Sequence, residues 1–181
     1  VHSYIWSDLA KNKALGIETP ENVRVINAQT PDHQFLRVSM IPTLLSFTKE
    51  NRGYGEEFSI FEIGHTVEGL RADGKCNEQK KLGVALYSKV AGEEELFLRA
   101  RDAALELCRD ILHREPCFVS READFDFEHP VNSFDVVIDG AKIGYISVPH
   151  PTVLANYEIG TKVYCAALNM DTLFECRDTE V

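Results

Sequence analysis

Three carboxylates alternate with two aromatic residues in one short stretch, where Phe125 and Phe127 separate Asp124, Asp126 and Glu128. Side chains two positions apart lie on the same face of a β-strand. Carboxylate oxygens on one face could bind a divalent cation, but the same alternation is typical of an edge strand or an exposed loop. The pattern leaves both interpretations open and favours the second, so we predict no metal site in the chain.

The histidines also lack the spacing of metal ligands. His129 and His150 lie about twenty residues apart, and each is followed by a proline. Structural zinc sites usually draw their ligands from closely spaced pairs. A His-Pro pair is more typical of a turn in which the imidazole ring hydrogen-bonds to the backbone. We therefore expect both histidines to have structural roles.

Glu62 is a carboxylate whose partner can be predicted. In an extended strand it shares a face with Phe58 and Ile60, and an isolated charge among apolar side chains is too costly to persist. We predict that Arg37 binds Glu62, with the backbone N–H groups of a helix as the alternative donors. Both residues are assigned structural roles, and the sequence indicates no catalytic residue.

Composition and charge exclude several classes of function. The chain has 181 residues and a formal net charge of −10, so strong nucleic-acid binding by this domain alone is not expected, because phosphate contacts require clustered Lys and Arg. No apolar run is long enough to span a membrane. The five cysteines form no C-x-x-C pair, which favours structural buried thiols in a reducing cytoplasm. Because the chain starts with Val1, we expect residues 1–181 to be a single domain of a longer protein.

Residues 35–51 are predicted to form a helix with two apolar stripes. The first stripe contains Leu36, Met40, Leu44 and Phe47, and the second contains Val38, Ile41 and Leu45. A surface helix usually has a single apolar stripe, so we predict that the second stripe faces a partner. Pro42 lacks an N–H, and it should either kink this helix or lie in the first turn of a second one.

Residues 58–67 are predicted to form a strand that is apolar on both faces. Phe58 and Ile60 point to one face, and the other face carries Phe61, Ile63 and Val67. Strands covered on both faces usually lie in the centre of a sheet. We therefore predict a central strand, in which Gly64 is a structural residue.

The remaining sequence alternates between strands and helices. Asp139 and Gly140 predict a tight hairpin turn, because Asp-Gly tolerates positive φ. Hairpins combined with long helices indicate an α+β fold, with a mostly antiparallel sheet flanked by helices. Residues 68–79 are predicted to form a loop or a loose hairpin. Further strands are predicted over residues 1–6, 23–26, 80–89, 117–121, 133–138, 142–148 and 162–169, and further helices over 8–15, 93–114, 152–157 and 171–174.

Three short motifs follow one another in this sequence. They are Leu36-Arg37-x-Ser39-x-Ile41-Pro42-x-Leu44-Leu45, then Asn51-Arg52, then Ile60-Phe61-Glu62-Ile63-Gly64. Their order and spacing resemble the β subunit of phenylalanyl-tRNA synthetase, which reads LRTSLLPGLL, a helix ending near N-R, and LFEIG. Val38 and Thr43 stand where that family usually has Thr and Gly.

The C-terminal half extends the resemblance over nearly the whole chain. His129-Pro130, the Asp139-Gly140 hairpin and His150-Pro151 are similar to the family's HPGxSA…dGxxIGxxGxLHP pattern. The resemblance implies the core fold of class II synthetases, in which the helix and strand of residues 34–68 correspond to the dimer-interface motif. The loop at residues 27–33 departs from the family's NPLS-S-D/E pattern.

The resemblance also implies a function for the chain. It would be a non-catalytic domain that pairs with the catalytic α subunit, in a cytoplasmic α₂β₂ enzyme that joins phenylalanine to tRNA(Phe). ATP and Mg²⁺ would bind at the partner subunit and no cofactor would bind here, while a second copy of the chain is the alternative partner for the isolated domain. The altered loop keeps a second hypothesis open, in which the chain is a free-standing β-like binding or regulatory module.

The Arg-bearing motifs of class II catalysis are not found in this sequence. Phe97-x-Arg99 resembles the first of them only superficially, because its spacing places it on an amphipathic helix rather than a strand. Gly140 and Gly144 belong to a hairpin that no arginine follows. We therefore predict neither ATP binding nor adenylate formation by this domain.

Overall fold

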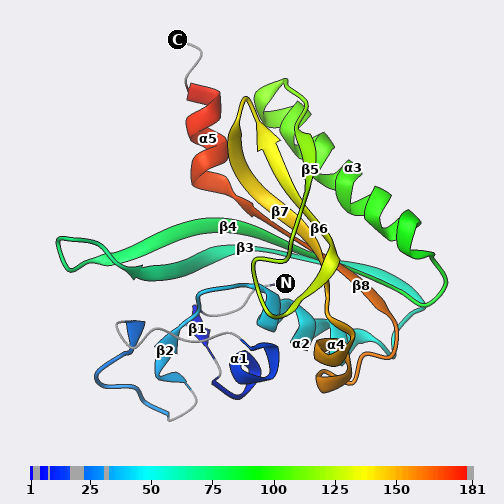
Figure 1. The fold of residues 1–181 in the computed structure, drawn as a ribbon. Helices are drawn as coiled ribbons and strands as arrows, with labels where there is room; N and C mark the ends of the chain where they lie inside the picture. The colour runs from blue at the N-terminus through cyan, green and yellow to red at the C-terminus, as the bar shows by residue number, and fades with distance from the viewer. Residues whose placement is uncertain (2–4, 8, 17–22, 31–32, 179–181) are drawn as a thin grey trace.

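A six-stranded antiparallel sheet forms the centre of the computed structural model, which describes residues 1, 5–7, 9–16, 23–30 and 33–178 (Figure 1). The strands lie in the order β3-β4-β8-β7-β6-β5. Their bounds are β3 Glu57–Leu70, β4 Cys76–Ser88, β5 Cys117–Arg121, β6 Glu128–Ile138, β7 Ala141–Pro149 and β8 Lys162–Asn169. Every neighbouring pair is antiparallel, so the predicted α+β class with a mostly antiparallel sheet is confirmed.

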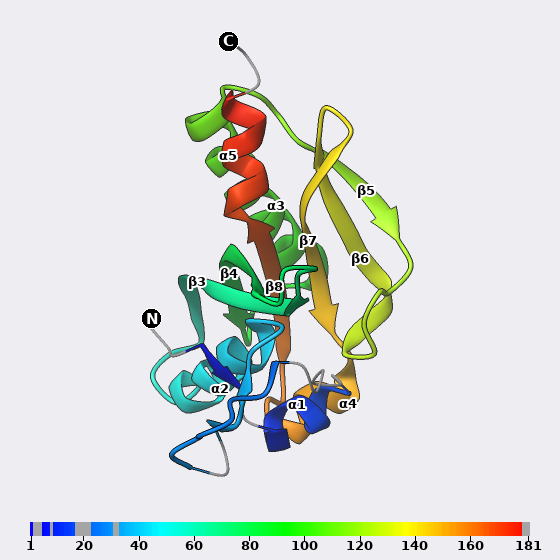
Figure 2. The ribbon, with the colours of Figure 1, turned by 90° about the vertical axis from the view of Figure 1, so that its left-hand side faces the viewer.

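Helices cover both faces of this sheet (Figures 1 and 2). One face packs against α2 (Ile41–Asn51), with α1 (Leu9–Leu15), α4 (Pro151–Asn156) and the short β1–β2 pair (Trp6–Ser7 and Phe35–Leu36) beyond it. The other face packs against α3 (Glu93–Leu112) and α5 (Met170–Asp178). The sheet therefore separates two hydrophobic cores, one under α2 and α4 and one under α3 and α5.

Helix α2 begins later than the pattern predicts. It starts at Ile41 with Pro42 in its first turn, where the missing N–H costs no helical hydrogen bond. The segment from 35 to 40 is not helical, so the prediction of one helix over residues 35–51 is wrong. The alternative of two short helices is correct only in placing Pro42 in a first turn, because no helix precedes α2 in this segment.

The second apolar stripe does not form a surface. The side chains of Ile41 and Leu45 are fully buried in the same core as Leu44 and Ile60, and only Val38, which precedes the helix, stays half-buried. The prediction that Ile41 and Leu45 face a partner is therefore wrong. The late helix start explains the error, because α1, α4 and the sheet together cover more of a short helix than one sheet alone could cover.

Strand β3 lies at the edge of the sheet, not at its centre. Its inner face, which includes Ile60 and Glu62, packs against α2, but Phe61 and Ile63 on the outer face are 61% and 48% exposed. The central-strand prediction is wrong because α3 lies over the middle of the sheet and leaves the outer face of β3 uncovered (Figure 1).

The β3–β4 hairpin is longer than predicted. Residues 68–70 and 76–79, expected in a loop or a loose hairpin, continue the two strands, with an irregularity between Val67 and Leu70. The outer part of this ribbon extends past the rest of the sheet (Figure 1).

The remaining elements follow the predictions in part. The strand predicted over residues 23–26 is only an isolated bridge at Arg24, β6 begins at Glu128 rather than at residue 133, and α5 extends beyond the predicted 171–174. Asp139 and Gly140 take positive φ values of 49° and 83° and join β6 to β7, as the tight-turn pattern predicted. Strand β5 and strand β8 have the predicted bounds, whereas α3 ends at Leu112, where His113 adopts a left-handed conformation. Parts of the strand predicted over residues 1–6 and of the helix predicted over residues 8–15 lie outside the described residues.

Candidate functional site

A buried ion pair fixes the segment that leads into α2 against the edge strand. Arg37 Nη2 donates to Glu62 Oε1 at 3.0 Å, and the two side chains are 3% and 1% exposed. Arg37 Nε also donates to the carbonyl of His65 at 2.8 Å, and Val67 N donates to the carbonyl of Arg37. The contact predicted between Arg37 and Glu62 is therefore present.

Gly64 leaves the space that the Arg37 guanidinium occupies. A Cβ at this position would lie 2.2 Å from Arg37 Nη2 and 3.0 Å from Glu62 Oε1. Any side chain at position 64 would have to displace the guanidinium from its carboxylate. The Gly64 in the LFEIG-like motif is thus explained by close packing.

An apolar surface lies on the opposite side of the same edge strand. Phe61 pairs with Val84 and Ile63 pairs with Leu82 across β3 and β4, so the four side chains share one face of the sheet. We call this set the β3 outer face. A cavity of about 80 Å³ continues from Leu82 and Val84 toward α3, where its wall includes Ala103 and Leu107. The β3 outer face and this cavity form a continuous apolar region that α3 leaves partly open.

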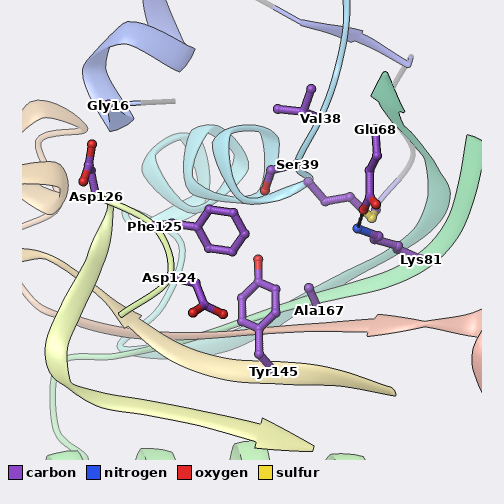
Figure 3. Close-up of a pocket in the computed structure, with 11 residues that line it drawn as sticks. Gly16, Val38, Ser39, Glu68, Lys81, Asp124, Phe125, Asp126, Tyr145 and Ala167 are labelled. Atoms are coloured by element: carbon purple, nitrogen blue, oxygen red, sulfur yellow. Dashed lines mark hydrogen bonds and ion pairs between the residues drawn. The ribbon is translucent and has the colours of Figure 1, made fainter. Parts of the chain in front are cut away.

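The largest of the described cavities lies on the α2 side of the sheet and has a volume of about 650 Å³ (Figure 3). We call it the Tyr145 cavity. Tyr145 and Ala167 are register partners on β7 and β8 and line it from the sheet, while Val38, Ser39 and Met40 line it from the segment before α2. Phe125, from the loop between β5 and β6, also lines this space.

The charged groups of the Tyr145 cavity are one lysine and three carboxylates. Lys81 forms an ion pair with Glu68 at one end. Asp124 lies 3.3 Å from Arg121 and 3.2 Å from Lys142, and Asp126 follows beside Gly16. Burial, together with the charge of Glu128, raises the pKa of Tyr145, so its hydroxyl stays protonated, and it hydrogen-bonds to Ser39.

The acidic stretch of residues 124–128 is organised around an arginine. Glu128 accepts hydrogen bonds from Arg121 at 2.9 and 2.8 Å and from the backbone N–H of Asp124 at 2.9 Å. Phe125 stacks on Phe127 with ring centroids 5.0 Å apart. Over the described residues, no three His, Cys, Asp or Glu side chains are grouped so that they could hold a metal ion.

Both histidines of the His-Pro pairs accept the predicted hydrogen bond from the backbone, although His129 lies within β6 and not in a turn. The Nδ1 atom of His129 accepts from the N–H of Val131 at 3.3 Å, and the Nδ1 atom of His150 accepts from the N–H of Thr152 at 3.2 Å. His150 thereby caps the start of α4.

The cysteines differ in burial. Cys108 and Cys165 are buried, and burial raises the pKa of their thiols to about 11 and about 12. Cys76 and Cys176 are half-buried and Cys117 is exposed, so the prediction of buried thiols is correct for only part of the set.

The family model of the phenylalanyl tRNA synthetase beta chain CLM domain matches residues 1–170. The chain belongs to this family. It is 26% identical to the phenylalanine–tRNA ligase beta subunit of Leptospira borgpetersenii, over 99% of this chain and 23% of that subunit. It is 25% identical to the beta subunits of Syntrophus aciditrophicus and Methanococcus maripaludis, over 88% and 80% of this chain. The chain therefore spans about a quarter of the length of the relatives it matches.

Solved structures of synthetases have the same fold as this CLM domain. Pyrrolysyl-tRNA synthetase from Desulfitobacterium hafniense superposes with a TM-score of 0.74 over 99% of this chain and 60% of that chain, at 18% identity. A second structure of the same enzyme gives a TM-score of 0.74 at 17% identity. The predicted class II synthetase core is thus confirmed as the fold of this domain.

The Phe97-x-Arg99 motif of this CLM domain lies away from the Tyr145 cavity. Arg99 is on the surface of α3, on the opposite side of the sheet, and binds Glu95 and Glu57. No helix within the described residues is long and apolar enough to cross a membrane.

Sequence reasoning missed the Tyr145 cavity. Its lining comes from segments far apart in the sequence, including the loop between β5 and β6 and the strands β4, β7 and β8. The Asp139-Gly140 turn gives only a partial signal. Counting from that turn would place Tyr145 opposite Phe134, whereas an irregularity between Val136 and Val137 shifts its partner to Asp135. The count says nothing about Phe125 or Lys81.

Proposed function

We propose that this chain is a non-catalytic, core-like domain of a phenylalanyl-tRNA synthetase β subunit. It assembles with the catalytic α subunit in a cytoplasmic α₂β₂ enzyme that uses ATP to ligate phenylalanine to tRNA(Phe). The observation that carries this proposal is the β3 outer face, an exposed apolar surface on the strand whose motif matches the family's interface motif.

The exposure of Phe61 supports a role in assembly. At 61% exposure its ring lies mostly in water, beside Ile63 at 48%. Single exposed apolar residues are common, but contiguous apolar patches usually mark interaction sites. Edge strands are also rarely left open in natural proteins, because their unpaired backbone groups invite pairing. The α subunit as the partner comes from the family, whose members are named as beta chains or beta subunits.

The charges of the Tyr145 cavity support a non-catalytic role. Binding of a triphosphate usually requires several cationic groups or a bound metal ion. The cavity is lined by Lys81, which Glu68 already neutralises, and by the carboxylates of Asp124 and Asp126. An anionic nucleotide would therefore meet net negative charge on this face of the sheet.

A free-standing β-like binding or regulatory module is the alternative function. It is favoured by the departure of residues 27–33 from the family's loop pattern. In this alternative the β3 outer face would contact a second copy of the chain or a different protein.

Co-expression with the α subunit of the same organism tests the proposal. We expect the 181-residue chain to co-purify with the α subunit, and the purified chain alone to show no phenylalanine-dependent exchange of pyrophosphate into ATP. Failure to associate, together with a stable homodimer of the chain, would favour the alternative. Phenylalanine-dependent exchange by the chain alone would contradict the non-catalytic assignment.

A further inference from the structure

We propose that the Tyr145 cavity binds a small organic cation, an ammonium group carried on an aromatic or aliphatic body. This inference rests on the geometry of the cavity and is independent of the assembly proposed above. It assigns a ligand to a surface on the opposite side of the sheet from the β3 outer face.

The size of the cavity suits a small molecule. Its volume of about 650 Å³ lies within the roughly 300–1,000 Å³ typical of ligand pockets. Val38, Met40 and Ala167 supply apolar walls, so the body of the ligand would leave water for a hydrocarbon surface. This combination of apolar walls and a few polar groups is the usual composition of a ligand site.

The charge of the lining selects a cation. Three carboxylates and one lysine line the cavity, and Lys81 is already paired with Glu68. Arg121 and Lys142 compensate Asp124 from the side of the sheet. The carboxylate of Asp126 is exposed at the end of the cavity beside Gly16, and we assign the ammonium to it.

Aromatic rings lie next to these carboxylates. Phe125 is 43% exposed although it stacks on Phe127, and its centroid lies 5.8 Å from that of Tyr145. Cations are attracted to the faces of aromatic rings, and ammonium ligands are commonly held by aromatic side chains. A ligand in the cavity would cover the exposed part of the Phe125 ring (Figure 3).

Two hydroxyl groups add a polar anchor. Tyr145 hydrogen-bonds to Ser39, and the oxygen of Ser39 accepts from the N–H of Ile41 at 3.2 Å. The hydroxyl of Tyr145 is thereby held in one place, on the side of the cavity that the segment before α2 lines (Figure 3). A polar group on the ligand could bind there while its ammonium lies near Asp126.

NMR titration of the isotopically labelled chain with three matched probes tests the proposal. The probes are 2-phenylethylamine, the neutral 2-phenylethanol and the anionic 3-phenylpropionate, which share an aromatic body and differ in charge. We expect saturable shift changes at the amides of Phe125, Tyr145 and Ala167 with the amine, weaker changes with the alcohol and none with the carboxylate. Equal responses to the three probes, changes confined to other parts of the chain, or no saturation with the amine would overturn the proposal.

Substitutions separate charge recognition from simple filling of the cavity. Asp126→Asn should weaken binding of the amine by up to about fivefold, the upper end of what an exposed ion pair contributes, and should leave binding of the alcohol unchanged. Phe125→Leu should weaken both. The matched control is Asp110→Asn on α3, which removes an exposed carboxylate on the other side of the sheet. Amine affinity that is equal in the parent and in Asp126→Asn, with both folded by their amide spectra, would overturn the assignment.

Discussion

Arg37 and Glu62 are 25 residues apart in the sequence, yet their side chains meet at 3.0 Å in the interior of the protein. The pair joins the segment before α2 to the edge strand β3, and Gly64 provides the space for it. It therefore fixes the relative position of the two elements that carry the Leu36-Arg37 and Ile60–Gly64 motifs. The β3 outer face is positioned by this contact although it lies on the opposite side of the strand.

Breaking this pair should destabilise the domain strongly. Arg37→Met removes the guanidinium that binds the buried Glu62 carboxylate, which we expect to cost about 3–5 kcal/mol in the free energy of unfolding. The double variant with Glu62→Leu should recover much of this loss, because neither charge then remains buried. Urea unfolding of the parent, the single variant and the double variant measures both effects. Equal stability of Arg37→Met and the parent would show that the pair does not hold the two segments.

Adjacent residues of β3 should respond very differently to a charge. Ile60→Asp places a carboxylate in the core under α2, and we expect it to cost several kcal/mol. Phe61→Asp places the same group in water, so we expect its melting temperature to stay near that of the parent. Thermal unfolding followed by circular dichroism gives both values. Similar large losses of stability in the two variants would contradict the exposed outer face of β3 and would favour a strand that is covered on both faces.

Ile41 should behave as a core residue. Ile41→Glu buries an unpaired charge in the first turn of α2, and we expect loss of the folded state rather than loss of association alone. Thr43→Glu is the matched control, because it places a carboxylate in the same turn, where the helix dipole favours it. Circular dichroism and sedimentation of both variants check this. An Ile41→Glu variant that stays folded but associates more weakly would support the prediction that Ile41 faces a partner.

The buried thiol of Cys165 should make stability fall at alkaline pH. Burial raises its pKa from 9.0 to about 12, so between these values the unfolded chain has lost a proton that the folded chain keeps. Stability is unaffected by this thiol below pH 9 and falls as pH rises toward 12, by up to about 1.4 kcal/mol per pH unit. Cys165→Ala should flatten the decline by that amount, and Cys117→Ala, at an exposed thiol, should not. Urea unfolding between pH 9 and 11 compares the slopes, and equal slopes for the parent and Cys165→Ala would contradict the prediction.

Local chemistry made parts of the structure predictable. The Asp139-Gly140 turn, the ring-to-backbone hydrogen bonds of His129 and His150 and the need of Glu62 for a partner each follow from one or two residues. The positions of Phe61 and Ile41 did not follow, because apolar periodicity reports which faces avoid water and not which element covers them. Phe61 is uncovered because α3 crosses the middle of the sheet, and Ile41 is covered because neighbouring helices pack around a short α2.

The Tyr145 cavity was not predictable for a different reason. Phe125 and Lys81 become neighbours of Tyr145 only when the β5–β6 loop and the β3–β4 ribbon approach the same face of the sheet. Each residue has an ordinary sequence environment. Their combination is a property of the tertiary fold.

The affinity of the chain for the α subunit is the measurement that tests the proposed assembly most directly. Sedimentation or calorimetry would compare the parent, Phe61→Glu and Val131→Glu, the last being an exposed valine on β6 that serves as the matched control. We predict that Phe61→Glu weakens binding by roughly tenfold or more, as expected for a central apolar interface residue, while Val131→Glu binds like the parent. Parent-like affinity of a folded Phe61→Glu variant would contradict the assignment of the β3 outer face as the assembly surface.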